Sequence, residues 1–203
     1  MKYLENISYT NINEGIKYLK THTFNYKLQN NETVIYHVYW YGEINRKQIC
    51  SINSYLKTQD LNNTKLWVWL DYKTYEISKD KIPIHKNIII KKYIPNEESK
   101  NTLLDQHECI FEEKKLKFRS DLARIIILYK YGGLYYDLDM ILLKDLKPLL
   151  NTEFCYNWSN FNYGNNGILR IKKHSELSIQ LMKKYINTLV KNKFSIMFNR
   201  LIF

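Results

Sequence analysis

The sequence contains little cysteine, proline or glycine. Its three cysteines, Cys50, Cys109 and Cys155, lie far apart and form no C-x-x-C pair. That spacing does not fit a zinc-binding module, and an odd, sparse count fits free thiols in a reducing compartment. The chain has only three prolines and six glycines, and it contains no internal repeat or low-complexity linker.

Long apolar runs are also absent. No stretch of about 18 consecutive apolar residues occurs, so we expect no membrane-spanning helix. The first twenty residues carry charges and asparagines throughout, which is not the pattern of a signal peptide. We therefore expect a cytoplasmic protein without a transmembrane anchor, and peripheral contact with a membrane stays open.

The formal net charge is +11, yet no block of five or six like charges appears. A basic surplus can attract nucleic acid, anionic lipid or phosphorylated small molecules, or it can simply be a solvated surface. The sequence has no basic helix or RNP-type aromatic strand, so we do not expect nucleic-acid binding. With 45% hydrophobic and 25% charged residues the chain has an ordinary globular composition.

Strand and helix patterns alternate through the first hundred residues. The segments Thr33–Trp40, Lys65–Leu70 and Asn87–Lys91 are apolar and rich in β-branched or aromatic residues, which predicts buried strands. A helical rhythm runs through Asn45–Lys57. Because continuous apolar strands are typical of parallel strands covered by helices on both faces, we predict an α/β fold.

The second half of the chain continues this alternation. We expect a helix at Lys114–Lys130, stopped by Gly132-Gly133, and a strand at Leu134–Leu138. The sequences FCYNWS and GILRIK predict two further strands, and His174–Lys191 predicts an amphipathic helix. The apolar last residues, FSIMFNRLIF, are expected to dock on the domain.

Two aspartates accompany the strand expected at Leu134–Leu138. Alternate residues of a strand share one face, so Asp137 and Asp139 are expected on one side and Leu138 on the other. Two close carboxylates repel each other unless a cation lies nearby, and hard ions such as Mg²⁺ or Mn²⁺ prefer carboxylate oxygens. The pair predicts half of a metal site, which a diphosphate could complete. Two solvated carboxylates at a strand end are the alternative.

Asp121 and Arg124 lie three residues apart on the preceding helix and so share a face. One interpretation is an intrahelical ion pair worth about 0.3–0.5 kcal/mol. The other is that both face the crevice of Asp137, where Arg124 contacts phosphate oxygens and Asp121 a sugar hydroxyl. Gly132-Gly133 predicts a tight reversal that brings helix and strand together.

The stretch FRSDLARIIILYKYGGLYYDLDMILLKDL resembles the sugar-nucleotide-binding region of DXD-containing glycosyltransferases of family 32, the mannosyltransferase and capsular-polysaccharide type. It is similar, more distantly, to the glucosylating domains of large clostridial toxins. The shared pattern is Ser-Asp-x-x-Arg, a Leu-Tyr run, Tyr-Gly-Gly, an aromatic pair and Asp-x-Asp. It stands here at Ser120, Asp121, Arg124, Tyr131, Gly132, Gly133, Tyr135, Tyr136, Asp137 and Asp139.

Two further segments carry the resemblance. IYHVYWYG resembles the family's opening strand, with His37, Trp40 and Gly42 in register. The resemblance implies that Trp40 stacks on the nucleobase, and a core tryptophan is the alternative. We expect His37 to be a buried, hydrogen-bonded core residue rather than a ligand. In YGNNGILRIKKHSEL, Asn165 and Asn166 are candidates for contacts to sugar hydroxyls, or for a plain loop role.

The resemblance implies a GT-A fold, a Rossmann-like, mostly parallel sheet flanked by helices, in one domain over residues 1–203. Residues 1–32 would be a lead-in, 33–150 the nucleotide-sugar-binding part, and 151–203 a part on the acceptor side. The implied activity is metal-dependent transfer of a sugar from a UDP- or GDP-sugar to a hydroxyl of a glycan, polysaccharide, lipid or protein.

The same resemblance implies roles for the site residues. Mn²⁺ or Mg²⁺ would be held by Asp139 with help from Asp137, and Arg124 would add a second cation toward the phosphates. Asp121 and Asp137 would orient ribose and sugar hydroxyls, and Tyr136 would contact the donor. The resemblance points to retention at the anomeric carbon, yet no base or nucleophile stands out, so the stereochemistry is open.

One departure from the family pattern lies near the C-terminus. Members often continue past this point, and their C-terminal part can supply a further metal ligand and acceptor contacts, for which His174 is only a weak stand-in. Two hypotheses follow. Either the metal relies on Asp139, phosphate and water, or the chain is a catalytically incomplete nucleotide-sugar-binding protein.

Overall fold

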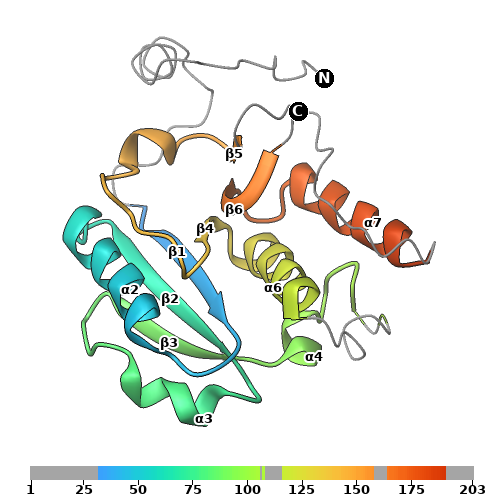
Figure 1. Ribbon diagram of the computed structural model, residues 1–203. Coiled ribbons are helices and arrows are strands. Elements are labelled where there is room, and N and C mark those ends of the chain that lie inside the picture. Colours follow the sequence, from blue (N-terminus) through green and yellow to red (C-terminus); the bar gives the residue numbers. More distant parts are fainter. Residues whose placement is uncertain (1–31, 106, 108–115, 158–163, 191–203) are drawn as a thin grey trace.

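The computed structural model describes residues 32–105, 107, 116–157 and 164–190 (Figure 1). Within them a six-stranded sheet has the order β3-β2-β1-β4-β6-β5. Its strands are β1 (Val34–Trp40), β2 (Thr64–Asp71), β3 (Ile88–Tyr93), β4 (Gly133–Tyr136), β5 (Phe154–Asn157) and β6 (Gly164–Ile171). The helices are α2 (Arg46–Thr58), α3 (Tyr75–Ser78), α4 (Pro95–Glu98), α6 (Leu116–Tyr131) and α7 (Glu176–Val190), with 3₁₀ turns at Lys79–Lys81 and Lys147–Leu149.

The sheet is parallel through its first four strands. β1 pairs with both β2 and β4, and β2 pairs with β3, all in the same direction. β6 runs antiparallel to β4, and β5 antiparallel to β6. The α/β class and the mostly parallel sheet expected from the alternating patterns are therefore confirmed.

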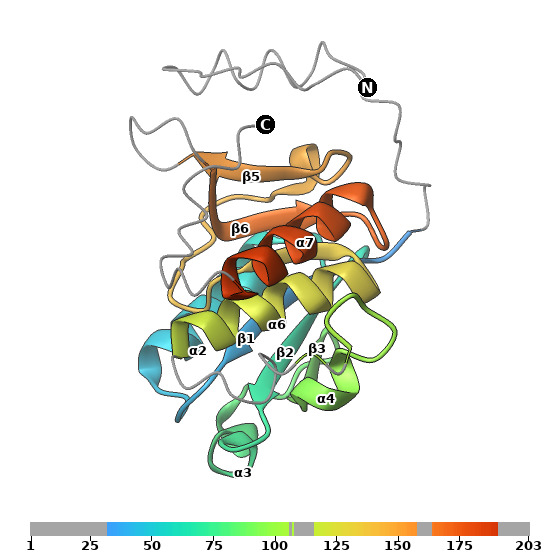
Figure 2. The same ribbon diagram turned by 90° about the vertical axis from the view of Figure 1, so that its right-hand side faces the viewer.

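Helices cover both faces of this sheet. α6 and α7 lie on one side and α2 on the other, as the two views in Figures 1 and 2 show. Alternate residues of β1 serve the two layers: Tyr36 and Val38 pack in the cluster that contains Ile52 of α2, whereas Tyr39 packs in the cluster that contains Ile126 of α6. Because both faces of β1 are buried, its sequence is almost continuously apolar.

Two glycines join α6 to β4. Both have positive φ, +63° at Gly132 and +107° at Gly133. A Cβ atom on Gly133 would stand 2.2 Å from the carbonyl oxygen of Ile35 in β1, and one on Gly132 would stand 2.6 Å from the backbone nitrogen of Lys173. The predicted tight reversal is thus present, and it exists because the backbones approach too closely for any side chain.

The predicted elements agree with the structure except at one boundary that affects the site. β4 ends at Tyr136, not at Leu138, because the chain turns there and the amide of Met140 donates to the carbonyl of Asp137 (3.0 Å). Asp137 and Asp139 therefore do not share a strand face. The lead-in, apart from Glu32, and the apolar last residues lie outside the described residues, as does Cys109.

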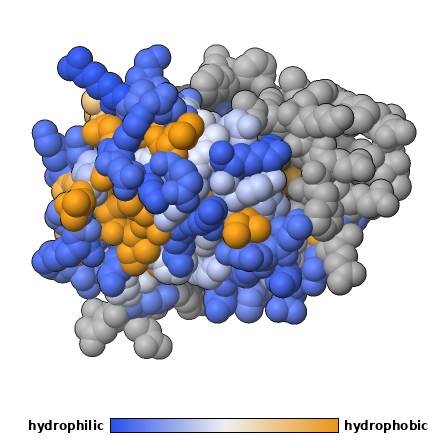
Figure 3. All heavy atoms as spheres, turned by 90° about the horizontal axis from the view of Figure 1, so that it is seen from below, coloured by the Kyte–Doolittle hydropathy of each residue, from blue (hydrophilic) through white to orange (hydrophobic). Residues whose placement is uncertain are grey.

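Cys50 and Cys155 are free thiols. Across the described residues, none of the helices combines the length and apolar character needed to cross a lipid bilayer. The face on the α3 side shows apolar side chains in separate patches among hydrophilic ones (Figure 3). Ile77 and Ile84, in and just after α3, are among the exposed large apolar residues, and isolated exposure of this kind is ordinary at a protein surface.

Candidate functional site

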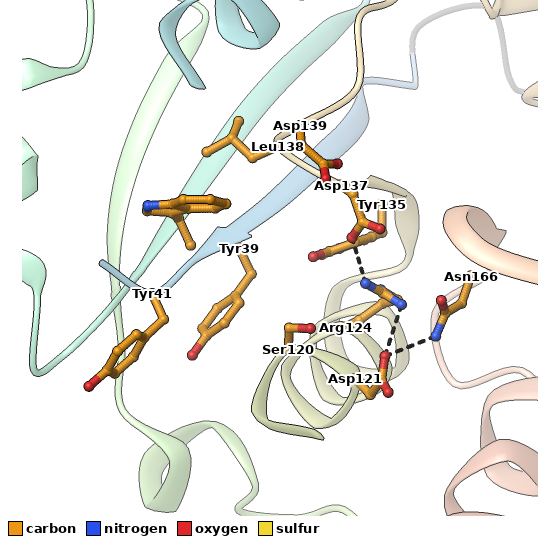
Figure 4. Close-up of a pocket in the computed structure, with 11 residues that line it drawn as sticks. Tyr39, Tyr41, Ser120, Asp121, Arg124, Tyr135, Asp137, Leu138, Asp139 and Asn166 are labelled. Atoms are coloured by element: carbon orange, nitrogen blue, oxygen red, sulfur yellow. Dashed lines mark hydrogen bonds and ion pairs between the residues drawn. The ribbon is translucent and has the colours of Figure 1, made fainter. Parts of the chain in front are cut away.

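A cavity of about 360 Å³ opens at the carboxyl ends of β1 and β4. Parallel α/β sheets commonly bind ligands at this edge, where strands from both sides of a crossover diverge. The walls come from β1, α6, β4, β6 and the turn after β4, and their side chains are drawn in Figure 4. Its lining residues are Tyr39, Trp40, Tyr41, Ser120, Asp121, Arg124, Tyr135, Asp137, Leu138, Asp139 and Asn166.

Arg124 links α6 to the turn after β4. One of its terminal nitrogens donates to Asp121 Oδ1 at 3.1 Å and the other to Asp137 Oδ1 at 2.5 Å. Its guanidinium also lies over the ring of Tyr135, 4.5 Å from the centroid. The intrahelical ion pair therefore exists, and both of its members face the cavity of Asp137. Their contacts to phosphate and to a sugar hydroxyl stay predictions.

Burial makes this arrangement electrostatically strong. The Arg124 side chain is only 3% exposed, and Asp137 is 36% exposed. Burial by itself would lower the pKa of Arg124, but Tyr135, Asp137 and Asp121 outweigh it and raise that pKa. Burial raises the pKa of Asp137, the charge of Arg124 opposes the rise, and Asp139 and Asp121 add to it. Arg124 is thus permanently charged and favours the ionised form of Asp137.

Asp139 differs from Asp137 in its surroundings. It lies in the turn after β4, it is exposed, and it makes no hydrogen bond or ion pair with any residue in the described part of the chain. Both carboxylates still line one cavity, although a turn rather than a strand brings them there. Asp139 is therefore the more exposed of the two carboxylates, and a ligand can approach it from solvent.

Of the two neighbouring asparagines, only Asn166 reaches the cavity. Its side-chain amide donates to Asp121 Oδ1 at 3.0 Å, which connects β6 to α6. The side chain of Asn165 instead accepts from the amide of Gly167 at 2.7 Å, and Asn165 is not among the lining residues. Asn165 thus makes a local contact, and it does not line this cavity.

The structure also places Tyr136 away from the cavity. Its side chain is fully buried in the cluster on the α2 face of the sheet. Tyr135 has the opposite orientation, lines the cavity and lies beside Arg124. The alternation of side chains along a strand could have indicated this from the sequence, because residues 135 and 137 share a side whereas residue 136 points the other way. Tyr136, the expected donor contact, therefore does not line this cavity, and Tyr135 is a lining residue that was not among the expected site residues.

The end of β1 forms an aromatic wall of the cavity. It consists of Tyr39, Trp40 and Tyr41, of which only Trp40 was expected. The indole nitrogen of Trp40 donates to the carbonyl of Glu43 at 3.2 Å, and the residue is partly exposed rather than fully buried. Aromatic rings of this kind provide a surface for a planar ligand group.

His37 is a core residue, as predicted. It is fully buried, its Nδ1 accepts from Trp69 Nε1 at 3.1 Å, and its Nε2 lies 2.8 Å from the carbonyl oxygen of Gly132. These partners fix the neutral tautomer with the proton on Nε2. Burial lowers the pKa of His37 to about 3, against the opposing effect of the Gly132 hydrogen bond. His37 therefore ties β1 to the glycine turn.

The carboxylates of the cavity are chemically suited to a hard divalent cation. Asp139 is exposed and has no partner among the residues that the structure describes, and Asp137 lies two residues away. Within the described ranges, no group of three or more His, Cys, Asp or Glu side chains is placed to hold a metal. Mg²⁺ and Mn²⁺ sites commonly use one or two carboxylates and complete the shell with phosphate and water. The donor set fits an ion that arrives with a phosphorylated ligand.

The fold has a counterpart among solved structures. The PaToxG glycosyltransferase superposes with a TM-score of 0.61 and 19% sequence identity, and the match covers 90% of this chain and 69% of that one. The apo structure of the WbbM bifunctional glycosyltransferase gives a TM-score of 0.43 at 16% identity, over 81% of this chain and 30% of that one. The sheet and its flanking helices define a GT-A fold.

The sequence gives the family. Residues 4–155 match the family described as glycosyltransferase sugar-binding region containing DXD motif, and the chain belongs to it. An Arabidopsis thaliana protein, described as Uncharacterized protein At4g19900, is 33% identical over 82 residues. That match covers 38% of this chain and 13% of the Arabidopsis protein, so the chain corresponds to a small part of that relative's length.

Proposed function

We propose that this protein transfers a glycosyl group from a UDP- or GDP-sugar to a hydroxyl of an acceptor, with Mn²⁺ or Mg²⁺ bound at Asp139 and Asp137. The observation that carries the proposal is a single cavity with two chemically different ends. One end has the exposed carboxylate of Asp139 beside the Asp137–Arg124 pair, and the other has the aromatic residues that follow β1. A nucleoside diphosphate has matching parts, a planar base and a charged diphosphate.

Each end has a defined task in this proposal. The aromatic wall receives the base, for which Trp40 and Tyr41 offer rings. Asp121 is held by Arg124 and Asn166, so its carboxylate is fixed in position to accept from a sugar or ribose hydroxyl. Arg124 acts mainly by orienting Asp121 and Asp137, because its two terminal nitrogens are already paired with them.

The chemical difficulty of the reaction is the departure of a nucleoside diphosphate as an anion. A divalent cation at Asp139 and Asp137 would supply Lewis-acid stabilisation of that charge. The protein's part is to place two carboxylates at the cavity, and the buried Arg124 beside Asp137 supplies a compensating charge.

A thermal-shift screen tests the proposal. The full chain is heated with UDP-glucose, UDP-N-acetylglucosamine, GDP-mannose and related donors, each with and without Mn²⁺. We expect a rise in Tm that needs both the metal and one class of donor, because a ligand that binds only the folded state stabilises it. No rise with any donor in the presence of Mn²⁺ or Mg²⁺ would contradict the proposal.

A second candidate is a nucleotide-sugar-binding protein that does not turn its ligand over. It is favoured by one observation, that a third protein ligand for a metal is absent from the described residues. Calorimetry that detects donor binding, combined with no hydrolysis and no transfer to a broad panel of acceptors, would support it over the enzyme. Metal-stimulated release of the nucleoside diphosphate would exclude it.

A further inference from the structure

A buried carboxylate at the end of β2 lies behind the aromatic wall of the cavity. Asp71 is the last residue of β2 and has no exposed surface. Its Oδ2 accepts from the hydroxyl of Tyr39 at 2.7 Å, and its Oδ1 accepts from the backbone amide of Lys73 at 3.0 Å. Asp71 is not among the residues that line the cavity, so a direct ligand contact does not explain the burial of its charge.

Arg119 supplies the charge that Asp71 needs. It lies in the first turn of α6, is 13% exposed, and donates to Asp71 Oδ2 at 2.5 Å. The guanidinium of Arg119 also lies over the ring of Tyr41, with 4.8 Å between the guanidinium carbon and the ring centroid. One ion pair therefore contacts two of the three aromatic residues in the wall, Tyr39 through Asp71 and Tyr41 through Arg119.

The segment that follows the wall is also fixed by hydrogen bonds. The amide of Gly42 donates to Thr74 Oγ1 at 3.0 Å, and the carbonyl of Gly42 accepts from Ser78 Oγ at 2.8 Å. Ser78 Oγ in turn accepts from the amide of Ile44 at 3.1 Å. The carbonyl of Asp71 accepts from the amide of Thr74, so the same turn after β2 positions both the carboxylate and these hydroxyls.

We propose that Asp71 and Arg119 are positioning residues that hold Tyr39 and Tyr41 in place and thereby set the affinity for the nucleobase end of the donor. The proposal rests on the function proposed above. It assigns the ion pair to one end of the cavity only, because its contacts are with the aromatic wall. The carboxylate end is held by a separate pair, Arg124 with Asp121 and Asp137.

The reason for using a buried ion pair is geometric. An apolar pair could fill the same volume, but it could not accept from the Tyr39 hydroxyl and the Lys73 amide at the same time. Removing one member of a buried pair leaves the other charge uncompensated, so the remaining side chain is expected to seek water and release its aromatic neighbour. A mobile ring must be ordered when the base stacks on it, and the free energy that this ordering costs weakens the binding of the base.

The test compares two ligands that share only the diphosphate. Calorimetry with Mn²⁺ measures the Kd of the nucleoside diphosphate that the wild-type chain prefers, UDP or GDP, and the Kd of inorganic pyrophosphate. In Asp71→Asn and Arg119→Gln we expect the nucleotide to bind at least tenfold more weakly and pyrophosphate to bind within about twofold of wild type. The double variant should be no weaker than the worse single variant, because the two residues act as one unit.

Milder variants test the same proposal if Asp71→Asn or Arg119→Gln does not fold. Tyr39→Phe removes only the hydroxyl that reaches Asp71, and we expect a smaller loss that is again confined to the nucleotide. Arg119→Lys keeps the charge and should recover part of the affinity lost in Arg119→Gln. Lys130→Gln is the matched control, since it breaks a half-buried pair with Glu98 outside the cavity and should leave both Kd values unchanged.

The outcomes separate this proposal from the function on which it rests. Equal weakening of nucleotide and pyrophosphate, or unchanged nucleotide affinity in folded Asp71→Asn and Arg119→Gln, would overturn the role of the pair while leaving the function in place. A wild-type chain that binds neither UDP nor GDP would overturn the proposed function, and the role of the pair with it.

Discussion

Arg124 lies between two carboxylates, Asp121 and Asp137, whose negative charges would repel each other more strongly without it. One terminal nitrogen contacts Asp121 at 3.1 Å and the other contacts Asp137 at 2.5 Å, and the arginine side chain is only 3% exposed. Water has little access to this position, so it cannot compensate the two carboxylates in place of the arginine. The cavity can hold Asp121, Asp137 and Asp139 together because one buried cation compensates the two that are paired, which leaves Asp139 available to a ligand.

Replacing Arg124 by methionine should destabilise the fold. The substitution leaves a buried carboxylate uncompensated, and breaking a buried pair costs about 3–5 kcal/mol. Urea denaturation followed by circular dichroism gives the free energy of unfolding. Lys147→Met is the control, because its pair with Asp60 involves a lysine that is 63% exposed. An exposed pair of this kind is worth about 1 kcal/mol or less. Equal, small losses in the two variants would show that the Arg124 pairs are not stabilising.

Replacing Asp139 by asparagine should remove function and spare stability. The side chain is exposed and has no partner among the described residues, so the free energy of unfolding should stay within about 0.5 kcal/mol of wild type. Metal-stimulated release of the nucleoside diphosphate should fall by about a hundredfold or more, since a charge-stabilising group is lost. Asp80→Asn, an exposed aspartate outside the cavity, is the control. Retained metal-stimulated turnover in Asp139→Asn would contradict the assigned metal site.

His37 should make the stability depend on pH. Its pKa is lowered from 6.5 to about 3 in the folded chain, so between these values the unfolded state binds one more proton than the folded state. Stability is then fully present above pH 6.5 and is lost as the pH falls. The expected loss from pH 7 to pH 5 is about 2 kcal/mol from this residue.

Urea denaturation of wild type and His37→Gln over that range measures the effect. The glutamine variant should be less stable at pH 7, but its stability should change less between pH 7 and pH 5. Parallel pH profiles for the two proteins would mean that His37 does not control this dependence.

Replacing Gly133 by alanine should be far more damaging than the same change at Gly42. Both glycines have φ values unsuited to other residues, +107° and +120°. A Cβ on Gly133 would clash with the backbone of Ile35, whereas the nearest atom to one on Gly42 is the Trp40 indole nitrogen at 3.6 Å. We expect a loss of about 3 kcal/mol or more at Gly133 and about 1–2 kcal/mol at Gly42. Thermal and urea unfolding give both values, and a smaller loss at Gly133 would contradict the close approach of β4 to β1.

Much of the fold follows from local patterns in the chain. Apolar runs with helical segments between them determined an α/β sheet, and the glycine pair Gly132-Gly133 determined that α6 and β4 meet tightly. The position of Asp137 and Asp139 after an apolar strand determined that carboxylates gather at the carboxyl edge of the sheet. These features depend on periodicity and chemistry over short distances, so the amino-acid order alone contains them.

The tertiary structure decided which side chains share the cavity. Tyr135 rather than Tyr136 faces α6, and Asn166 rather than Asn165 reaches Asp121, because the strand faces are assigned only when the helices pack on the sheet. The structure also decided that Arg124 is already paired on both sides, and that Asp71 at the end of β2 meets Arg119, 48 residues away along the chain. Contacts between residues so distant in sequence arise from packing, and no local pattern records them.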